Sequence, residues 1–326
     1  MSSSASLIAV SAADILRLLA PAETVGLVEA AALAAGREGC IVPARQHIRW
    51  PGGTLLTMPA IAPDAMSVKL VSVVPGNAAR ALPVTNGLLV LSDSETGLPR
   101  ALLDAAALTA VRTGAVGALG VKYLTPPATP SLGVVGTGVQ GAWVAISACA
   151  VRPIRTVFAV RRSAASFASF EKALAERAAG VRVVACANAA ELLERTGVIV
   201  TATTSAAPVL PDTPSLLEGR HFVAMGSYER HMRELPDGVF RLAGHLVLDS
   251  EFARHEVGEA VHSVEQRLIP EANVFTIGEL AAGKRTLDIT RTTAYKSAGM
   301  ALFDLYVARA LHAAALRRGV GQEVVL

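Results

Sequence analysis

A glycine-rich turn in the middle of the chain has the residue types and spacing of a phosphate-binding loop. In the segment SLGVVGTGVQGA, the strand-forming run Leu132–Val135 is followed by Gly136, Gly138 and Gly141 in a G-x-G-x-x-G pattern. Gly136 permits a tight turn, Gly138 lets backbone approach a ligand closely, and the N–H groups that open the next helix attract an anion. The pyrophosphate of a dinucleotide fits this geometry, but the pattern alone is weakly specific and needs the right fold around it.

Two arginines at the end of the next expected strand indicate which dinucleotide binds. In dinucleotide-binding folds this strand end meets the adenosine ribose, where a carboxylate suits NAD and basic residues accommodate the 2′-phosphate of NADP. Here the strand ends in Arg161 and Arg162, with no carboxylate. Guanidinium groups match phosphate geometry, so the pattern favours NADPH over NADH. The alternative is that both arginines are ordinary exposed residues.

Three basic side chains outside this segment have the chemistry to hold a small carboxylate. Lys69 lies in the otherwise apolar segment SVKLVSVV, on the same strand face as Val71 and Val73. A buried ammonium needs an anionic partner or ligand, whereas an edge-strand lysine would reach back to water. Arg112, in a small-residue helix, has a guanidinium that can bind a carboxylate through two hydrogen bonds, and Arg45 adds a third positive charge. Together they indicate a carboxylate substrate.

The elements that must position these basic residues form an N-terminal domain, residues 1–125. Helices are expected to begin near Ser11, which has a capping pattern, and near Pro21. Residues 101–122 are predicted as one long alanine-rich helix, and the proline-rich segment 126–130 marks the domain boundary. Short turns connect three predicted strands in an antiparallel or mixed sheet: 54–59, 66–74 and 87–93.

The second domain, residues 126–289, alternates strands with helices, which predicts a doubly wound parallel (Rossmann) sheet for the nucleotide. The glycine turn follows its first strand, as nucleotide binding requires. A long helix at 297–318, within the C-terminal part 290–326, is expected to pack back on the first domain and complete an α+β substrate and dimerisation domain. The predicted strands are 132–135, 156–160, 181–185, 198–202, 221–225 and 246–249. The predicted helices are 139–150, 163–179 and 188–195.

Composition argues against several other classes of protein. A net charge of +3 and 4% aromatic residues, with no basic run, do not suit nucleic-acid binding. The uncharged stretch 123–151 is long enough for a membrane span, but prolines and glycines interrupt it, and the opening MSSSAS lacks the basic segment of a signal peptide. Three widely spaced cysteines suit the cytoplasm. The histidines lack metal-ligand spacing, so no metal is expected, and no G-x-S-x-G elbow supports acyl transfer.

Ten different short motifs are distributed along almost the whole chain, and together they are far more specific than the glycine pattern. They are Met58-Pro59, Val68–Leu70, Pro75–Asn77, Thr96-Gly97, Leu108–Ala115, Gly136–Gln140, Gly226-Ser227, Met232–Pro236, Asp249-Ser250 and Lys296–Asp304. With them the chain resembles the ornithine cyclodeaminase/mu-crystallin family nearly from end to end.

The resemblance implies a homodimer with a nicotinamide cofactor between the two domains of each subunit. It implies that Arg45, Lys69 and Arg112 lie near the substrate and cofactor, with Ala298 beside the substrate. With the glycines and arginines above, the expected nucleotide contacts are Thr85, Arg112, Gly136, Gly138, Val139, Gln140, Arg161, Arg162, Thr203, Met225 and Ser297.

One loop departs from the cyclodeaminases of this family, which have a catalytic aspartate after the fifth strand of the nucleotide domain. This chain has Tyr228 at that place, and a tyrosine titrates too high to activate an amine or water. The loop resembles the family branch that reduces cyclic imines, the Δ1-pyrroline-2-carboxylate and ketimine reductases. The resemblance implies reduction of Δ1-pyrroline-2-carboxylate to L-proline with NADPH or NADH, and of the six-membered Δ1-piperideine-2-carboxylate to L-pipecolate as a further reaction. Lys69 or Tyr228 would relay a proton.

Three alternatives remain open from the sequence. Two are enzymes, an ornithine cyclodeaminase and an L-alanine dehydrogenase. The third is a non-catalytic NADP-dependent binding protein of the mu-crystallin type, against which the retained Lys69 and Arg112 argue.

Overall fold

The computed structural model describes residues 6–161 and 163–325, in two compact units. The first unit combines Met1–Arg112 with Met300–Leu326, and the second is Thr113–Gly299. Arg162, one of the two arginines predicted to bind the 2′-phosphate, lies outside the described residues. So do residues 1–5, on which the prediction about a signal peptide depends.

The chain passes from the first unit to the second inside one helix, α3 (Ala105–Leu124), whereas the sequence favoured the proline-rich segment after it. The C-terminal half of α3 packs within the second unit. A Cβ added at Gly120 would lie 2.4 Å from the ring of Tyr295, and one at Gly117 would lie 2.8 Å from Val144. These glycines let the helix lie close to its neighbours, so this half of α3 belongs with the nucleotide-type sheet.

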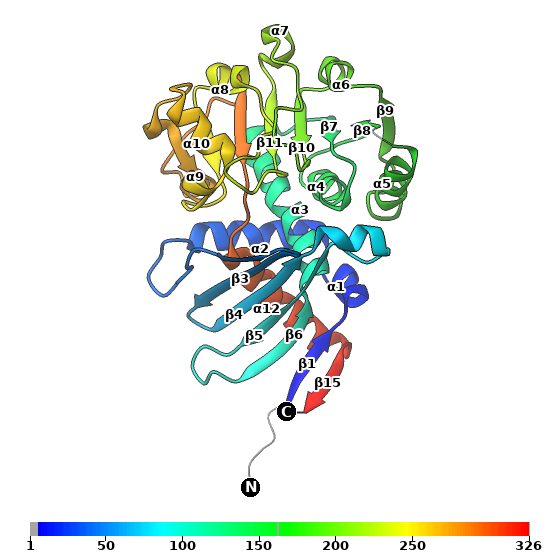
Figure 1. Cartoon of the computed structure of the whole chain (residues 1–326), viewed down its shortest axis with the longest axis vertical. Helices are drawn as coiled ribbons and strands as arrows, with labels where there is room; N and C mark the ends of the chain where they lie inside the picture. Colours follow the sequence, from blue (N-terminus) through cyan, green and yellow to red (C-terminus); the bar gives the residue numbers. More distant parts are fainter. Residues whose placement is uncertain (1–5, 162, 326) are drawn as a thin grey trace. The chain divides into compact units, whose positions relative to one another are not determined.

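The first unit is built on a seven-stranded mixed sheet (Figure 1). Its strands are β1 (Ser6–Val10), β2 (Gln46–Trp50), β3 (Gly53–Ala62), β4 (Ala65–Val73), β5 (Thr85–Ser92), β6 (Pro99–Asp104) and β15 (Gln322–Val325). The order is β15-β1-β6-β5-β4-β3-β2. The β1–β6 pair is parallel and the other neighbouring pairs are antiparallel. This agrees with the predicted mixed sheet, although the sequence did not predict β1, β2 or β15.

The predicted start of the long helix at residue 101 is wrong, because Ala101–Asp104 belong to β6. Ala101 and Leu103 are fully buried there, and the strand pairs with β5 on one side and β1 on the other. Alanine and leucine favour a helix locally, but pairing with two neighbouring strands outweighs that preference.

Helices of the first unit follow the sequence closely. Ser11 caps its helix by accepting a hydrogen bond from the backbone N–H of Asp14, as its pattern predicts. The C-terminal helix starts later than predicted, at Ala301, because Asp249 holds Ser297, Ala298 and Gly299 in a loop and Gly299 has a φ of 81°. The helix packs on the first unit as expected, behind β3 and β4 in Figure 1. The helical segments are α1 (Ala12–Leu18), α2 (Pro21–Ala34), η1 (Pro75–Arg80) and α12 (Ala301–Arg318).

Residues of β4 alternate between the two faces of this sheet. Ser67, Lys69 and Val71 are buried on the face that α12 covers, whereas Val68 and Leu70 are exposed on the other face. Lys69 therefore points inward, and the alternative of a lysine reaching back to water is wrong.

The second unit contains an eight-stranded, entirely parallel sheet. Its strands are β7 (Ser131–Val135), β8 (Thr156–Val160), β9 (Arg182–Cys186), β10 (Val198–Thr201), β11 (His221–Ala224), β12 (Leu246–Leu248), β13 (Val274–Thr276) and β14 (Thr293–Lys296). The order is β13-β12-β14-β11-β10-β7-β8-β9. The six predicted strands are confirmed, whereas β13 and β14 were not predicted.

Helices cover both faces of the parallel sheet, which confirms the doubly wound (Rossmann) fold. On one face, Leu192, Phe222 and Phe240 belong to a continuous buried apolar cluster. On the other face lie α3 and α4, as the Gly120 and Gly117 contacts show. The helical segments are α4 (Val139–Cys149), α5 (Ala164–Arg177), α6 (Ala189–Arg195), α7 (Pro214–Leu217), α8 (Asp237–Ala243), α9 (Ala253–Glu256), α10 (Gly258–Glu265), η2 (Glu271–Asn273) and α11 (Ile277–Ala281).

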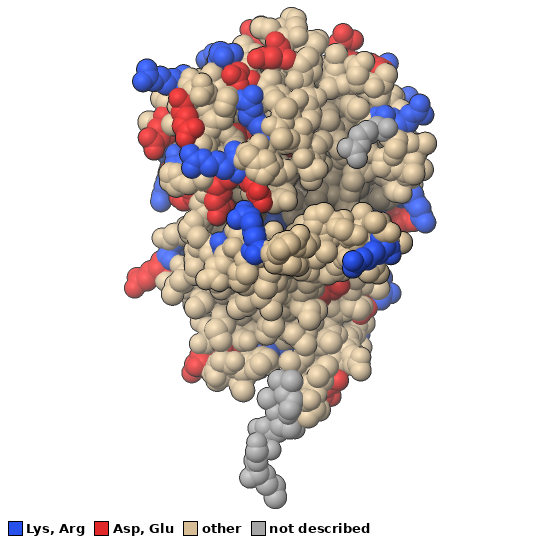
Figure 2. Space-filling view, viewed as in Figure 1, with Lys and Arg blue, Asp and Glu red and all other residues tan. Residues whose placement is uncertain are grey.

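The described part of the chain has no helix that is both long and apolar enough to cross a membrane. Charged side chains of both signs are interspersed over the face shown in Figure 2. That face therefore offers no basic patch of the kind that binds nucleic acid.

Candidate active site

The glycine turn has the backbone geometry that its sequence predicts. Gly136 has a φ of 108°, and a Cβ added there would lie 2.4 Å from the carbonyl oxygen of Ala202. A Cβ at Gly141 would lie 2.0 Å from the carbonyl oxygen of Gly136, so this glycine is needed for packing. A Cβ at Gly138 would meet no protein atom within 4 Å. Gly138 is thus free of any packing requirement, as expected for a position where a ligand lies against the backbone.

The residues around this turn leave room and charge for an anion. Gly138 is the N-cap of α4, and no side chain caps the helix, so its first N–H groups stay available. Val139 is 65% exposed, which is unusual for valine, and Gln140 is half-buried. Arg161 follows β8 and is exposed, as a ribose-phosphate partner needs to be, while Arg162 lies outside the described residues.

A buried ion cluster in the first unit joins Lys69 and Arg112 through Asp304. The Lys69 Nζ donates to Asp304 Oδ2 at 2.8 Å, and the Arg112 Nε donates to Asp304 Oδ1 at 2.9 Å. The Lys69 Nζ also lies 3.4 Å from the Thr109 hydroxyl. Asp304 is 1% exposed and Lys69 is equally buried. Strand β4, helix α3 and helix α12 each supply one charged group to this cluster.

The charges of this cluster shift each other's protonation. Burial lowers the pKa of Lys69 to about 7, against the attraction of Asp304, and the positive charges of Arg112 and Arg45 act in the same direction as burial. Burial raises the pKa of the Asp304 carboxyl, but Arg112 and Lys69 outweigh it and hold that pKa below its usual value. With Lys69 protonated, two cations share one carboxylate, and the cluster carries one net positive charge.

The other predicted residues of the first unit lie at different distances from this cluster. Arg45, just before β2, is half-buried, and its positive charge contributes to lowering the pKa of Lys69. Thr85 begins β5, four residues before Leu89, which pairs with Lys69. At about 3.4 Å per residue, Thr85 therefore lies more than about 10 Å along the sheet from the cluster.

Predicted residues of the second unit gather at the C-terminal edge of its sheet. Thr203 follows β10, and Met225 and Tyr228 follow β11, next to it in the sheet. Met225 is buried, whereas Tyr228 is 38% exposed. These residues come from neighbouring strands of one parallel sheet, where ligands of this fold bind.

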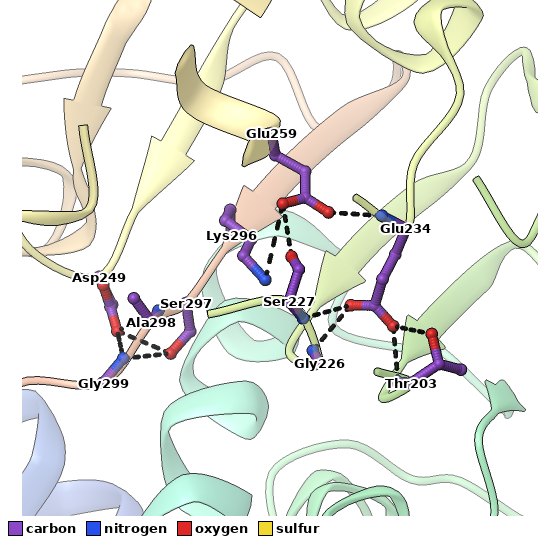
Figure 3. A network of polar contacts seen from close by, with 10 residues as sticks. All are labelled: Thr203, Gly226, Ser227, Glu234, Asp249, Glu259, Lys296, Ser297, Ala298 and Gly299. Carbon is purple, nitrogen blue, oxygen red and sulfur yellow. Dashed lines mark hydrogen bonds and ion pairs between the residues drawn. The ribbon is translucent and has the colours of Figure 1, made fainter. Parts of the chain in front are cut away.

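Ser297 and Ala298 follow β14 at the same edge and are held by a buried carboxylate (Figure 3). Asp249 Oδ2 accepts hydrogen bonds from the Ser297 hydroxyl at 2.6 Å, from the Ala298 N–H at 3.0 Å and from the Gly299 N–H at 2.6 Å. The segment that precedes α12 therefore has a defined course.

Three buried carboxylates, one in the first unit and two in the second, have no role predicted from the sequence. Asp304 is the partner of both Lys69 and Arg112, and Glu234 and Glu259 hold the loops that carry Thr203 and Tyr228. The available signal was a charge inside an apolar run, as in ALFDLY around Asp304, the same signal that identified Lys69. The described residues contain no group of three or more His, Cys, Asp or Glu arranged to hold a metal ion.

A doubly wound parallel sheet with this glycine turn after its first strand defines a dinucleotide-binding α/β protein. The model of the ornithine cyclodeaminase/mu-crystallin family matches residues 10–319. The chain belongs to this family, as the resemblance of its motifs implied.

Curated relatives and solved structures narrow the comparison. A Delta(1)-pyrroline-2-carboxylate reductase of Bacillus cereus (strain ZK / E33L) is 32% identical over 295 residues, which cover 88% of this chain and 90% of that protein. A Delta(1)-pyrroline-2-carboxylate/Delta(1)-piperideine-2-carboxylate reductase of Azospirillum brasilense is 34% identical over 270 residues, 83% of each chain. The structure of Thermococcus litoralis Delta(1)-pyrroline-2-carboxylate reductase in complex with NADH and L-proline matches with a TM-score of 0.90 at 29% identity, covering 98% of this chain and 100% of that one.

Proposed function

We propose that this protein is an enzyme that reduces the C=N bond of Δ1-pyrroline-2-carboxylate to give L-proline, with NADPH as the preferred donor and NADH as the alternative. The observation that carries the proposal is the buried cluster in which Lys69 and Arg112 share the single carboxylate of Asp304. One further anion balances this cluster, and a cyclic imino acid brings one in its carboxylate. Similarity to the Bacillus and Azospirillum reductases supports this substrate class, and the latter supports Δ1-piperideine-2-carboxylate as a second substrate.

In this proposal the substrate carboxylate binds beside Lys69 and Arg112, with Arg45 adding positive charge at the margin and Ala298 contacting the ring. Arg112 uses its Nε for Asp304, so its terminal nitrogens are the groups proposed for the substrate. Each charge-assisted hydrogen bond of this kind contributes about 1.5–3 kcal/mol.

We place the cofactor-binding site, called the cofactor seat below, in the second unit. The pyrophosphate binds over Gly136 and Gly138 at the N-terminus of α4, where Val139 and Gln140 begin the helix. The adenosine 2′-phosphate binds Arg161 and Arg162, which is the reason for preferring NADPH. The remaining contacts proposed in this unit are Thr203, Met225 and Ser297, whereas Thr85 and Arg112 of the first unit are contacts that the family resemblance implies.

When bound, NADPH supplies the hydride that C2 of the ring accepts. A protonated imine already carries its proton, so the main work of the chain's own residues is to orient the ring and stabilise its charge. For an imine that arrives unprotonated, we assign proton delivery to Lys69, because a pKa of about 7 lets it exchange protons near neutrality. Tyr228, which is 38% exposed, is the second candidate.

The outer face of the first unit's sheet supports a homodimer. Val68 and Leu70 of β4 and Leu88 of β5 are exposed on it. The surface over β3–β6 in Figure 2 has few charged side chains. A sheet face of this composition needs a covering layer, and a second copy of the chain supplies one through a two-fold axis.

The three cysteines are free thiols, in keeping with the predicted cytoplasmic location.

The test is a panel of four assays on the purified protein: NADPH oxidation with Δ1-pyrroline-2-carboxylate, with Δ1-piperideine-2-carboxylate and with pyruvate plus ammonia, and ammonia release from ornithine with NAD⁺. We expect oxidation with Δ1-pyrroline-2-carboxylate and with its six-membered analogue, and L-proline and L-pipecolate as products. Ammonia and proline from ornithine with NAD⁺ would instead establish a cyclodeaminase, and faster turnover of pyruvate with ammonia an alanine dehydrogenase. Cofactor binding with no turnover of any of the four would establish a binding protein.

A pair of lysine variants tests the assigned roles. Lys69→Met should lower kcat/KM for the imine by about 10- to 100-fold or more, because one hydrogen bond between charged groups is lost. Lys172→Met is the control, since Lys172 is an exposed residue of α5, and it should leave kcat/KM unchanged. Unaltered reduction by the Lys69 variant would show the assignment to be wrong.

A further inference from the structure

Two buried glutamates beneath the C-terminal edge of the parallel sheet hold two of its loops together (Figure 3). Glu234 Oε1 accepts hydrogen bonds from the Thr203 N–H at 2.6 Å and the Thr203 hydroxyl at 2.8 Å. Glu234 Oε2 accepts from the Gly226 N–H at 2.7 Å, with the Ser227 N–H further away at 3.4 Å. One carboxylate therefore joins the loop after β10 to the loop after β11.

Glu259, on α10, supports the same loop through its carboxylate. Its Oε2 accepts from the Ser227 hydroxyl at 2.5 Å, and its Oε1 accepts from the backbone N–H of Glu234 at 2.7 Å. The ammonium of Lys296, at the end of β14, lies 3.9 Å from Glu259 Oε2. Ser227, Glu234, Glu259 and Lys296 are all completely buried.

The loops after β10 and β11, which Glu234 joins, also contact each other directly. A Cβ added at Gly226 would lie 1.9 Å from the carbonyl oxygen of Thr203 and 2.7 Å from Glu234 Oε1. Burying carboxylates costs free energy unless hydrogen bonds compensate, and the Glu234 carboxylate accepts its hydrogen bonds from Thr203, Gly226 and Ser227, which all lie in these two loops. The hydrogen bonds of these buried carboxylates therefore fix the conformation of the two loops.

Sheet order indicates which half of a dinucleotide these loops face. The glycine turn follows β7, and the strand that meets the adenosine ribose, β8, lies on one side of it. Strands β10 and β11 lie on the other side of β7. A dinucleotide whose pyrophosphate lies over the glycine turn therefore extends its nicotinamide half toward the loops that Glu234 joins.

We propose that Glu234 and Glu259 are positioning residues that set the nicotinamide half of the cofactor seat by fixing Thr203, Gly226 and Ser227, next to Tyr228. This inference rests on the proposed function for the identity of the cofactor. It assigns neither glutamate a contact with substrate or cofactor. Both act through the loops they hold.

The test separates the two halves of the cofactor by titrating the full-length protein with NADPH and with adenosine 2′,5′-bisphosphate, which lacks the nicotinamide half. Glu234→Gln keeps the side chain's size but replaces one acceptor oxygen by an N–H₂ group that faces backbone N–H donors. We expect the Kd for NADPH to rise about 10- to 100-fold, with the Kd for the bisphosphate changed by less than about twofold.

The matched control is Glu265→Gln, on the same helix as Glu259. Glu265 pairs with Arg230 of the same loop at 2.7 Å, but both side chains are exposed, so the change should leave both affinities unaltered. If Glu234→Gln does not yield folded protein, Ser227→Ala replaces it. This variant removes the 2.5 Å hydrogen bond to Glu259 and should show the same selective loss at about 3- to 10-fold.

Each remaining outcome identifies what has failed. Unchanged affinity of a folded Glu234→Gln protein for both ligands, or equal weakening of both, overturns the positioning role. A wild-type protein that binds NADPH but does not reduce the cyclic imine overturns the proposed reaction and leaves this inference standing. A wild-type protein that binds neither ligand overturns both.

Discussion

The ammonium of Lys69 and the carboxylate of Asp304 lie 2.8 Å apart inside the first unit, although 235 positions separate them in the sequence. Asp304 lies in the first turn of α12, and Lys69 lies on the face of β4 that this helix covers. The ion pair therefore ties the C-terminal helix to the N-terminal sheet at the position proposed for the substrate's carboxylate.

Loss of the shared carboxylate should destabilise the fold strongly. Asp304→Asn leaves Lys69 and Arg112 buried without an anion, which should lower the free energy of unfolding by about 3–5 kcal/mol. Denaturant titration followed by circular dichroism measures the change. The control is Asp64→Asn, which breaks the exposed ion pair between Asp64 and Arg309, a residue of α12. This change should lower the free energy of unfolding by less than about 1 kcal/mol. Equal midpoints for the two variants would contradict the buried charge balance.

Two glycines of the same turn should respond differently to alanine. At Gly138 an added Cβ meets no protein atom within 4 Å, so Gly138→Ala should fold with an unchanged melting temperature while its Kd for NADPH rises at least about tenfold. At Gly141 the Cβ would lie 2.0 Å from the Gly136 carbonyl, so Gly141→Ala should also lower the melting temperature. Thermal unfolding and NADPH fluorescence titration measure both effects. Tight NADPH binding by Gly138→Ala would show that the pyrophosphate does not lie there.

Carboxylate binding should weaken as the pH rises through about 7. Below the pKa of Lys69 the cluster has two cations and one anion, and above it the amine is neutral and the net charge is lost. Pyrrole-2-carboxylate is a suitable probe, because its carboxylate stays ionised through this range and its ring nitrogen does not titrate. Calorimetry should show its Kd rising by up to about tenfold per pH unit above the pKa. Lys69→Met should bind it weakly at every pH, and a wild-type profile without this rise would refute the role of the ammonium.

Cofactor preference should depend on Arg161. Arg161→Ala should lower kcat/KM with NADPH by about tenfold and change kcat/KM with NADH little, because only NADPH has the 2′-phosphate. Arg155→Ala is the matched control, since Arg155 is exposed just before the opposite end of the same strand. Equal losses with both cofactors would remove the basis for preferring NADPH.

The proposed homodimer should be sensitive to charge on the outer sheet face. Leu70→Glu places a carboxylate at a residue that is 41% exposed and should produce a monomer in analytical ultracentrifugation. Leu316→Glu is the control, because Leu316 is also exposed but belongs to α12, which packs on the other face of the sheet. A dimer that persists in the Leu70 variant would place the interface elsewhere.

Local patterns were sufficient to predict much of this fold. The Gly136 turn, the alternating strands and helices after Leu132, and the Ser11 cap each depend on neighbours within a few residues. Lys69 was predictable for a related reason, because period two in β4 places it on the buried face.

Features that depend on distant partners were not predictable in the same way. Ala101–Asp104 has helix-forming residues, and only pairing with β1 and β5 makes it a strand. Glu234 lies 31 residues from Thr203, and no periodicity links them. Charges inside apolar runs indicate that partners exist, but only the fold identifies those partners.

In the proposed reaction a hydride passes from the cofactor to the carbon that bears the substrate's carboxylate. The direct test is to supply NADPH deuterated at either face of nicotinamide C4, together with Δ1-pyrroline-2-carboxylate, and to analyse the product by mass spectrometry. We predict L-proline that carries one deuterium at C2 with one of the two labelled cofactors and none with the other. Unlabelled proline from both cofactors, or labelled cofactor left unconsumed in the presence of the imine, would show that this hydride transfer does not occur.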